Sequence, residues 1–314
     1  MNSNELRQHL QQYLELRDAI GFKVRNSRLI YRFVEFASQQ CDSTDVSATL
    51  VCTWVDLQSG SASAKARRLG VVRPFLHYLG CCSPEVQQSF LRLYRSQSRS
   101  KPFLFESLEV ERMLSAAERF GANDSFFRMT LSTIVGLLAC TGLRISEALS
   151  LDRRDVMPKH NPRALYIRET KFRKSRIVPV HASTAEKLAT YAGHRMLLGY
   201  DLKTQAFFVS DAGQRLSYGT VAGAFHHLLD ELQIEARDGS RPPSIHSLRH
   251  TFVMNCLLRW HSEKIDVHTR LAHLATYLGH VDFGCTYWYV SCLPQLLGSA
   301  ADAFTAPISA EAQS

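Results

Sequence analysis

TYLGHVDFGCTYWYVSCLPQLL, residues 276–297, contains a histidine, His280, that is followed nine positions later by Tyr289. Two segments upstream carry side chains of related chemistry. TGLRISEAL, residues 141–149, holds Arg144, and HSLRH, residues 246–250, holds His246 and Arg249. His246 and Arg249 are three positions apart and share one face of a predicted helix. This ordered set of two arginines, two histidines and a late tyrosine is the most informative feature of the sequence.

These residue types suit a reaction at a phosphodiester. Negative charge grows on the non-bridging oxygens when a nucleophile attacks phosphorus, so such a site needs fixed positive donors. Arg144 and Arg249 would fill this role, because a guanidinium stays charged and binds phosphate through a planar fork. A tyrosine hydroxyl, with an ordinary pKa of about 10, needs help to ionise. We expect Tyr289 to be the nucleophile, His246 to accept its proton and His280 to donate a hydrogen bond to the phosphate.

Taken singly, each of these residues has a more ordinary interpretation. An arginine after a glycine is usually a solvated residue at a helix end, and a lone histidine such as His280 can cap a helix. Tyr287, Trp288 and Tyr289 would pass for an aromatic core cluster. Only the conjunction of the residues, in order and in their local contexts, favours a catalytic site. Tyr287 remains the alternative nucleophile, because two residues spaced two apart point to different sides of a helix and only one can enter the site.

The order and contexts of these residues resemble the tyrosine recombinase (phage-integrase-like) family over roughly residues 105 to 295. The resemblance implies a mainly α fold with a small antiparallel β-sheet (α+β), in which a helical core-binding domain and a catalytic domain clamp duplex DNA. It also implies a 3′-phosphotyrosyl link at Tyr289 and a released 5′-hydroxyl, with no metal, ATP or other cofactor. Recombination would proceed in a homotetramer that holds two DNA sites.

The family takes the proton for the leaving 5′-oxygen from a lysine on a β-hairpin. Two short segments here, residues 164–170 and 176–180, are rich in β-branched or aromatic residues and predict such a hairpin. The basic stretch between them offers Lys171 as the general acid, with Lys174 as the alternative. Glu147, one helical turn after Arg144, is expected to orient a member of the site.

Composition agrees with a protein that meets a phosphate-rich partner. The net charge is +8 and the pI about 9.1, with 45% hydrophobic and 21% charged residues, as in an ordinary globular protein. The eight cysteines form no CxxC pair and the N-terminus lacks a signal peptide, so we expect reduced thiols and a cytoplasmic location. His268 and His273 lack the i,i+4 spacing of a zinc-binding helix, and no apolar run predicts a membrane span.

Helical periodicity predicts helices over residues 5–20, 26–40 and 64–79 in the first part of the chain. The third carries basic residues among apolar ones, and a solvated face and a DNA contact are equally compatible with that pattern. With the resemblance added, we expect DNA contacts from this helix and from the hairpin turn, at Lys65, Arg67, Arg68, Arg73, Arg173 and Lys174.

The predicted domains are a helical DNA-binding domain over 1–98, a linker over 99–105 and a catalytic domain over 106–305, with a disordered tail over 306–314. Ser107 is a candidate N-cap for the first helix of the catalytic domain. Further helices are predicted at 126–140, 145–151, 183–197, 217–232 and 247–260. By analogy with the family, residues 293–304 would dock onto a neighbouring subunit.

Other functions stay open on the sequence alone. Two alternatives are a catalytically idle DNA-binding partner of a recombinase and a type IB topoisomerase-like enzyme. A third is a helix-turn-helix regulator that reads DNA through residues 215–221 and the next helix, but it leaves the tyrosine set unexplained. The interval between Arg249 and His280, with extra residues around 259–264, is longer than expected for chromosome-dimer resolvases. Residues 276–297 resemble recombinases of transposons and other mobile elements instead. The expected partners are recombination sites in duplex DNA, with short inverted repeats, and related recombinases. The site sequence and the outcome, whether integration, excision, resolution or inversion, are not encoded in any motif.

Overall fold

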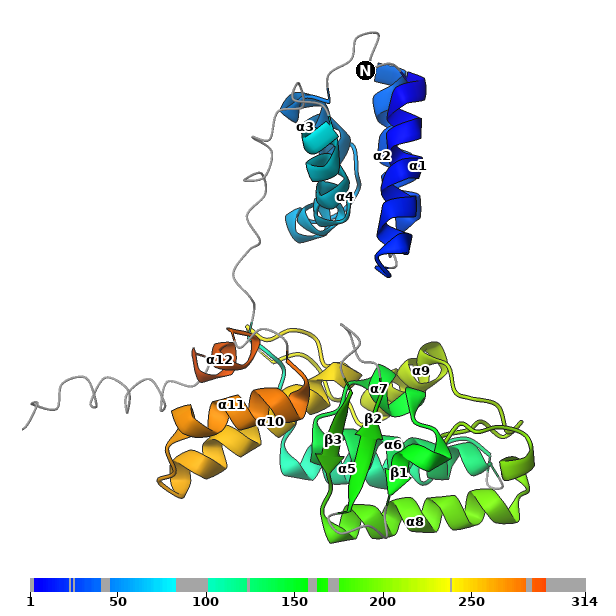
Figure 1. Ribbon diagram of the computed structural model, residues 1–314. Coiled ribbons are helices and arrows are strands. Elements are labelled where there is room, and N and C mark those ends of the chain that lie inside the picture. Colours follow the sequence, from blue (N-terminus) through cyan, green and yellow to red (C-terminus); the bar gives the residue numbers. More distant parts are fainter. Residues whose placement is uncertain are drawn as a thin grey trace, which may run out of the picture. The chain divides into compact units, whose positions relative to one another are not determined.

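The computed structural model describes residues 3–22, 24, 26–40, 46–82, 101–122, 125–157, 163–168, 175–237, 239–280 and 284–291, except for the side chains of residues 268 and 291. The chain divides into two compact units, Met1–Arg99 and Ser100–Ser314. Figure 1 shows that the described part of the first unit is wholly helical, whereas the second combines helices with one small sheet.

The first unit is built from four described helices, α1 (Ser3–Ala19), α2 (Ser27–Gln40), α3 (Ala48–Asp56) and α4 (Ala62–Cys82). Their apolar stripes meet in one core, where Ile30, Phe33, Trp54 and Phe75 are almost fully buried. The sequence predicted α1, α2 and most of α4 but not α3. This helix has only nine residues, although Val51, Trp54 and Val55 are buried at helical spacing. Its first turn is capped by the Ser47 hydroxyl, which accepts from the Leu50 backbone N–H at 3.2 Å.

The second unit is mainly helical with a small antiparallel sheet, as predicted. Its helices are α5 (Ser107–Ala117), α6 (Phe126–Thr141), α7 (Ile145–Ser150), α8 (Ala182–Leu197), α9 (Tyr218–Glu231), α10 (Ile245–Ser262), α11 (Val267–Leu278) and α12 (Gly284–Ser291). Two short 3₁₀ helices are η2 (Arg153–Asp155) and η3 (Tyr200–Leu202). The strands β1 (Val156–Met157), β2 (Ala164–Ile167) and β3 (Arg176–Pro179) form a sheet in the order β1-β2-β3, with Leu165 opposite Val178.

Several local predictions differ from the structure. Strand β1 was not expected, and β2 ends at Ile167 rather than at 170, after which the Arg168 side chain turns to Asp155. Ser107 is not the N-cap of α5. Glu106 is, and its backbone N–H donates to the Glu109 carboxylate at 2.8 Å.

The expected linker over 99–105 overlaps the core of the second unit. Phe103 and Phe105 are 1% and 4% exposed, and their rings pack edge to face. The backbone N–H of Phe105 donates to the Thr251 hydroxyl at 2.8 Å, which fixes this segment to α10. A polar stretch closed by Pro102 suggested a linker, but burial of the two phenylalanines outweighs that local signal.

Helices α10, α11 and α12 form a subassembly at one side of the sheet, drawn in yellow to red-orange in Figure 1. Val253 and Leu257 of α10 pack against Leu271 and Leu274 of α11 and Tyr289 of α12 in one apolar cluster. Helix α11 was not predicted, although Val267, Leu271, Leu274 and Leu278 recur at helical spacing. This packing brings the HSLRH, LGH and Tyr289 segments together. Among the described residues, no helix is both long enough and apolar enough to cross a membrane.

Candidate active site

Arg249 lies at the centre of the candidate site. It is on α10, only 2% exposed, and its Nη1 donates to the Gly142 carbonyl oxygen at 2.6 Å. Its Nη2 donates to the Leu278 carbonyl oxygen at 2.9 Å and to Nε2 of His280 at 2.8 Å. Burial, together with the neighbouring Arg144, lowers the pKa of Arg249 to about 10, so the side chain is charged at neutral pH. A buried guanidinium that is anchored on carbonyl oxygens is a fixed positive donor.

Arg144 enters the site from a sharp turn between α6 and α7. Gly142 ends α6 with a φ of 62°, and a Cβ there would lie 2.5 Å from Phe252, so the turn requires glycine. Arg144 follows as the N-cap residue of α7 and is half-buried. Its guanidinium donates to the carbonyl oxygens of Leu278 and Gly279 at 3.4 and 3.2 Å. Both arginines therefore bind the end of α11, immediately before His280.

Glu147 connects Arg144 to an arginine that the sequence analysis did not assign to the site. Its carboxylate accepts from Arg144 Nη1 at 2.8 Å and from both terminal nitrogens of Arg176 at 3.1 and 2.9 Å. Burial alone would raise the pKa of Glu147, but the hydrogen bonds and charges of Arg176 and Arg144 lower it below its ordinary value. Arg176, at the start of β3, also donates to the Tyr277 carbonyl oxygen at 2.8 Å. Glu147 thus makes the i,i+3 contact and also ties α7 to the sheet.

His280 follows Gly279 at the end of α11 and contacts two elements. Its Nε2 faces Arg249 at 2.8 Å, and its Nδ1 lies 2.7 Å from the hydroxyl of Thr286, a fully buried residue of α12. Burial and the charges of Arg249 and Arg144 lower the pKa of His280 to about 4, so the ring is neutral at physiological pH.

Tyr289 is 3% exposed, and its hydroxyl lies 2.7 Å from Nδ1 of His250. His250 directly follows Arg249, and burial with the charge of His246 lowers its pKa to about 3. The rings of His246 and His250 pack edge to face with centroids 4.8 Å apart. His246 itself is partly open to solvent, but the surrounding protein and nearby arginines lower its pKa to about 4. Tyr287 is 48% exposed on the same helix, on a different side from Tyr289.

Structure and sequence therefore differ on the partner of Tyr289. The sequence analysis assigned its proton acceptor to His246, whereas the hydroxyl contacts His250. The HSLRH segment gave both histidines, and their spacing of four along a helix was a signal that both lie near the same face. Thr286 carried no signal of its own, because a threonine inside an aromatic segment is an ordinary residue.

The remaining predicted residues belong to the first unit or lie outside the described residues. Lys171, Arg173 and Lys174 are outside them. In the first unit, Arg67 is exposed on α4, while Lys65 donates to the Asp56 carboxylate at 3.3 Å and Arg68 donates to the Ser59 carbonyl oxygen. Arg73 on the same helix is half-buried and keeps an interaction partner.

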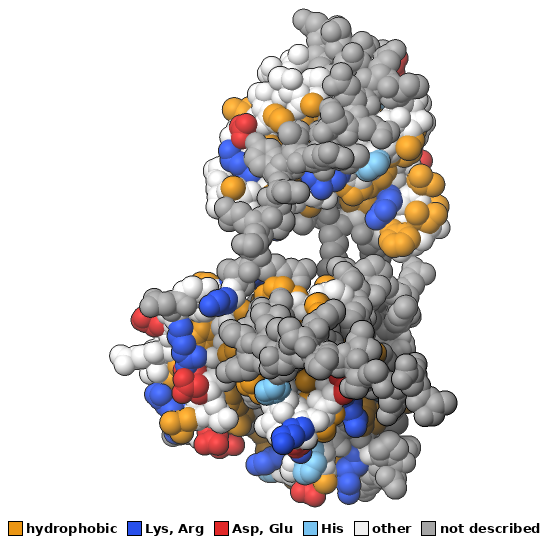
Figure 2. All heavy atoms as spheres, turned by 90° about the vertical axis from the view of Figure 1, so that its left-hand side faces the viewer, with side chains coloured by type: hydrophobic (Ala, Val, Ile, Leu, Met, Phe, Trp, Pro, Cys, Tyr) orange, Lys and Arg blue, Asp and Glu red, His pale blue; other side chains and the backbone are white. Residues whose placement is uncertain are grey.

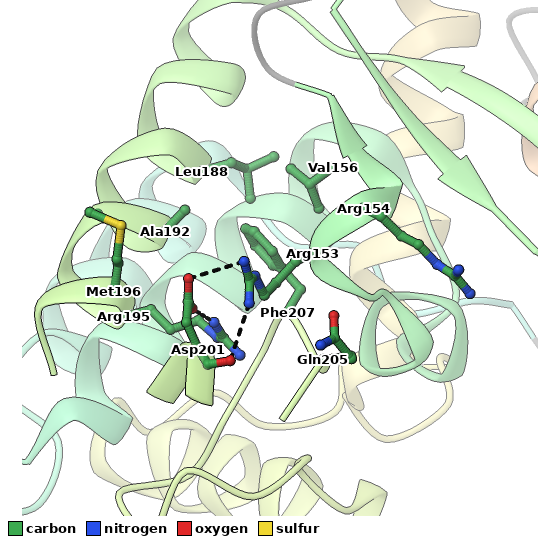
Figure 3. Close-up of a pocket in the computed structure, with 11 residues that line it drawn as sticks. Arg153, Arg154, Val156, Leu188, Ala192, Arg195, Met196, Asp201, Gln205 and Phe207 are labelled. Carbon is green, nitrogen blue, oxygen red and sulfur yellow. Dashed lines mark hydrogen bonds and ion pairs between the residues drawn. The ribbon is translucent and has the colours of Figure 1, made fainter. Parts of the chain in front are cut away.

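A separate hollow of about 480 Å³ lies between α8, η2 and η3 (Figure 3). Leu188, Val156 and Phe207 line one part, and Asp201 pairs there with Arg153 at 3.3 Å and with the buried Arg195. This carboxylate bridges two arginines from different elements and links η3 to α8. The described residues contain no group of three or more His, Cys, Asp or Glu side chains placed to hold a metal ion.

Residues 104–295 match the profile described as "Phage integrase family". The chain belongs to this family. Among curated proteins, this integrase-family chain is similar to "Putative integrase/recombinase y4rB" of Sinorhizobium fredii, with 34% identity over 94% of this chain and 95% of the relative. A second protein of that organism, "Putative integrase/recombinase y4rE", is 31% identical over 95% of each chain.

Solved structures share the fold of this integrase-family chain at low sequence identity. An integrase of the Tn1549 transposon, in complex with transposon right end DNA, is similar with a TM-score of 0.66 and 15% identity, over 97% of this chain and 99% of that one. The XerH site-specific recombinase bound to a palindromic difH substrate gives a TM-score of 0.65 and 18% identity, over 96% and 85%. A lambda integrase tetramer bound to a Holliday junction gives 0.61 and 16%, over 88% and 77%.

Proposed function

We propose that this member of the phage integrase family is a site-specific DNA recombinase that cleaves and rejoins strands through a 3′-phosphotyrosine at Tyr289. The observation that carries the proposal is the position of the Tyr289 hydroxyl, 2.7 Å from His250, next in sequence to the buried Arg249. Three separate segments, the α6–α7 turn, α10 and the α11–α12 region, contribute charged or polar side chains to one cluster. A packing role for Tyr289 alone would need none of these groups.

The cluster supports a defined order of events. Arg144 and Arg249 bind the non-bridging oxygens of the scissile phosphate, and His280 donates a further hydrogen bond. The Tyr289 oxygen attacks phosphorus, the bond to the 5′-oxygen breaks, and Lys171 or Lys174 gives that oxygen a proton. The phosphodiester energy is kept in the tyrosyl link, so a second 5′-hydroxyl reverses the step on a new strand without metal or ATP.

The Tyr289 hydroxyl must lose its proton as its oxygen attacks phosphorus. His250 is its nearest partner, but an imidazole with a pKa of about 3 is a weak base. His250 therefore accepts a hydrogen bond and orients the hydroxyl, while the positive charge of the two arginines lowers the cost of ionisation. The proton leaves through His250, which holds it only briefly because its pKa is low, to water beside the exposed ring of His246.

Binding of duplex DNA would involve both units. Figure 2 shows Lys and Arg side chains on both of them, mixed with other types rather than gathered in one patch. Among the predicted residues of α4, the exposed Arg67 suits a phosphate contact, whereas Lys65 and Arg68 hold the preceding loop at Asp56 and Ser59. Related proteins solved on transposon-end DNA and on a Holliday junction support action on mobile-element ends in a tetramer.

A suicide-substrate assay tests the proposal. Nicked duplexes from the ends of the DNA element that encodes the protein are first shown to bind by gel shift. They are then incubated, with a chelator, with the wild type, Tyr289→Phe and the matched control Tyr287→Phe. A covalent adduct in the wild type and the control but not in Tyr289→Phe is expected.

The other outcomes are equally informative. An adduct that persists in Tyr289→Phe moves the nucleophile, and loss of the adduct only in Tyr287→Phe assigns it to that residue. Absence of an adduct on bound DNA overturns the proposal in favour of an idle DNA-binding partner. Relaxation of plasmids that lack the element ends would indicate a topoisomerase instead.

A further inference from the structure

The hydrogen bonds of His280 fix the position of its ring proton. Arg249 reaches Nε2 at 2.8 Å, and a guanidinium has only N–H donors, so Nε2 must accept with its lone pair. A neutral imidazole then carries its proton on Nδ1. Nδ1 lies 2.7 Å from the Thr286 hydroxyl oxygen, which accepts that proton's hydrogen bond. The DNA-free protein thus holds the Nδ1–H tautomer.

This tautomer is wrong for the reaction proposed above. Nε2 is the nitrogen on the side of Arg249, where the phosphate would bind, and an unprotonated Nε2 cannot donate to a phosphate oxygen. His280 becomes a donor there only if Nε2 gains a proton. It does so by becoming an imidazolium or by exchanging tautomers.

The charges around the ring decide between these routes. Burial and then Arg249, Arg144 and Arg176 lower the pKa of His280 to about 4, and Glu147 only partly offsets them. One nearby opposite charge typically raises a pKa by about 1–3 units, so a bound phosphate brings it to about 7 at most. At pH 8 the ring therefore stays largely neutral, which leaves tautomer exchange.

Thr286 has the chemistry that such an exchange requires. A hydroxyl both accepts and donates, whereas a carboxylate or a backbone carbonyl at this place would hold Nδ1–H permanently. Thr286 is 0% exposed, so water does not take over the role of its hydroxyl. It also lies on α12 with Tyr289, so the state of His280 is linked to the helix that carries the nucleophile.

We propose that phosphate binding displaces Arg249 from His280 and moves the ring proton from Nδ1 to Nε2, with Thr286 as the positioning residue that changes from acceptor to donor. Nε2 takes a proton from water, and Nδ1 returns one to water when the half-buried ring of His280 opens to solvent, so the protein gains no net proton. This inference rests on the proposed function, because it needs a phosphate beside Arg249, but it concerns the bound state before any cleavage.

Nuclear magnetic resonance tests the exchange directly. Tyr289→Phe, which cannot form the adduct, is prepared with ¹⁵N-labelled histidine rings and studied at pH 8 with and without the duplex used above. Long-range ¹H–¹⁵N spectra distinguish the two tautomers and the imidazolium, and a His280→Gln version assigns the signals. We expect Nδ1–H without DNA and Nε2–H with it. Nδ1–H in both states, or a doubly protonated ring on DNA, overturns the proposal.

Two further variants, made in the same background, isolate the role of Thr286. Thr286→Val matches its shape without the hydroxyl, and Thr286→Ser keeps the hydroxyl. We expect the serine variant to reach Nε2–H on DNA as Thr286 does, and the valine variant to reach it incompletely, because no hydroxyl then donates to the buried Nδ1. Without DNA both variants should keep Nδ1–H, because Arg249 still donates to Nε2. A complete exchange on DNA in Thr286→Val would reduce Thr286 to packing and contradict its assigned role. Because these spectra need no cleavage, failure here is distinguishable from failure of the adduct assay.

Discussion

Replacing Glu147 by glutamine removes the charge that holds two arginines of the site. The side chain keeps its size, but one carboxylate oxygen becomes an NH₂ group that faces guanidinium donors. The ion pairs lost are those with Arg144 at 2.8 Å and with Arg176 at 2.9 Å, whose side chains are 29% and 11% exposed. Hydrogen bonds to charged groups contribute about 1.5–3 kcal/mol each, and breaking a buried pair costs about 3–5 kcal/mol. We expect a loss of roughly 3 kcal/mol in the free energy of unfolding.

Calorimetric unfolding of the full chain measures this loss. For a unit of this size, about 3 kcal/mol corresponds to a fall in Tm of about 6–12 °C. Glu186→Gln is the matched control, because Glu186 is an exposed carboxylate on α8, and its Tm should stay close to that of the wild type.

The effect of pH gives the sign of the electrostatic contribution. The pKa of Glu147 is lowered in the folded state, so its stabilisation is complete above its ordinary pKa of 4.5 and is lost as the pH falls through the folded value. The difference in Tm between the wild type and Glu147→Gln should therefore be largest at pH 7 and should shrink as the pH falls below 4.5. A Glu147→Gln variant as stable as the wild type at pH 7 would refute the reasoning.

Three more predictions follow from the contacts of the site. Gly279→Ala should lower the Tm more than Gly121→Ala. Both glycines have positive φ, but only at Gly279 would a Cβ meet another group, Arg176 Nη1, at 2.6 Å. Equal losses of Tm would show that backbone strain alone matters. A double-mutant cycle of His250→Leu and Tyr289→Phe in urea unfolding should give a coupling energy of about 0.5–1.5 kcal/mol, and a value of zero would contradict their hydrogen bond. Because the pKa of His250 is lowered to about 3, the unfolded chain binds more protons than the folded one between that pH and about 6.5. Stability should therefore fall as the pH drops through this window, and His250→Asn should make the fall shallower in acid titrations of unfolding.

The order of motifs in the sequence predicted several residues of the candidate site. Arg144, Arg249, His280 and Tyr289 each stand in a segment whose helix or turn depends on local residues, such as the glycine at 142 that ends α6 with positive φ. Local periodicity likewise predicted most helices, and β-branched and aromatic residues, with the family resemblance, predicted the β2–β3 hairpin. The spacing of Tyr287 and Tyr289 required that only one face the cluster, and Tyr289 is the buried one.

Burial that depends on contacts between distant segments could not be predicted from the sequence. Residues 96–102 are polar, basic and closed by a proline, and they suggested a linker that reaches residue 105. Phe103 and Phe105 nevertheless lie in the core of the second unit, because Thr251 and apolar neighbours far along the chain meet them there. No local pattern contains that information. Of the two unpredicted helices, α3 has only nine residues, whereas α11 has twelve and carries a helical period that was not recognised. In both, packing partners stabilise the helix more than its own propensity does.

The sequence by itself determined which chemical groups are present and in what order, because residue type, charge and short-range spacing are local properties. Only the tertiary structure decided which group each one contacts: that Tyr289 meets His250 rather than His246, that Arg176 shares Glu147 with Arg144, and that His280 lies between Arg249 and Thr286. These choices depend on how α10, α11, α12 and the sheet pack, and differences of an ångström in that packing select one hydrogen-bond partner over the next.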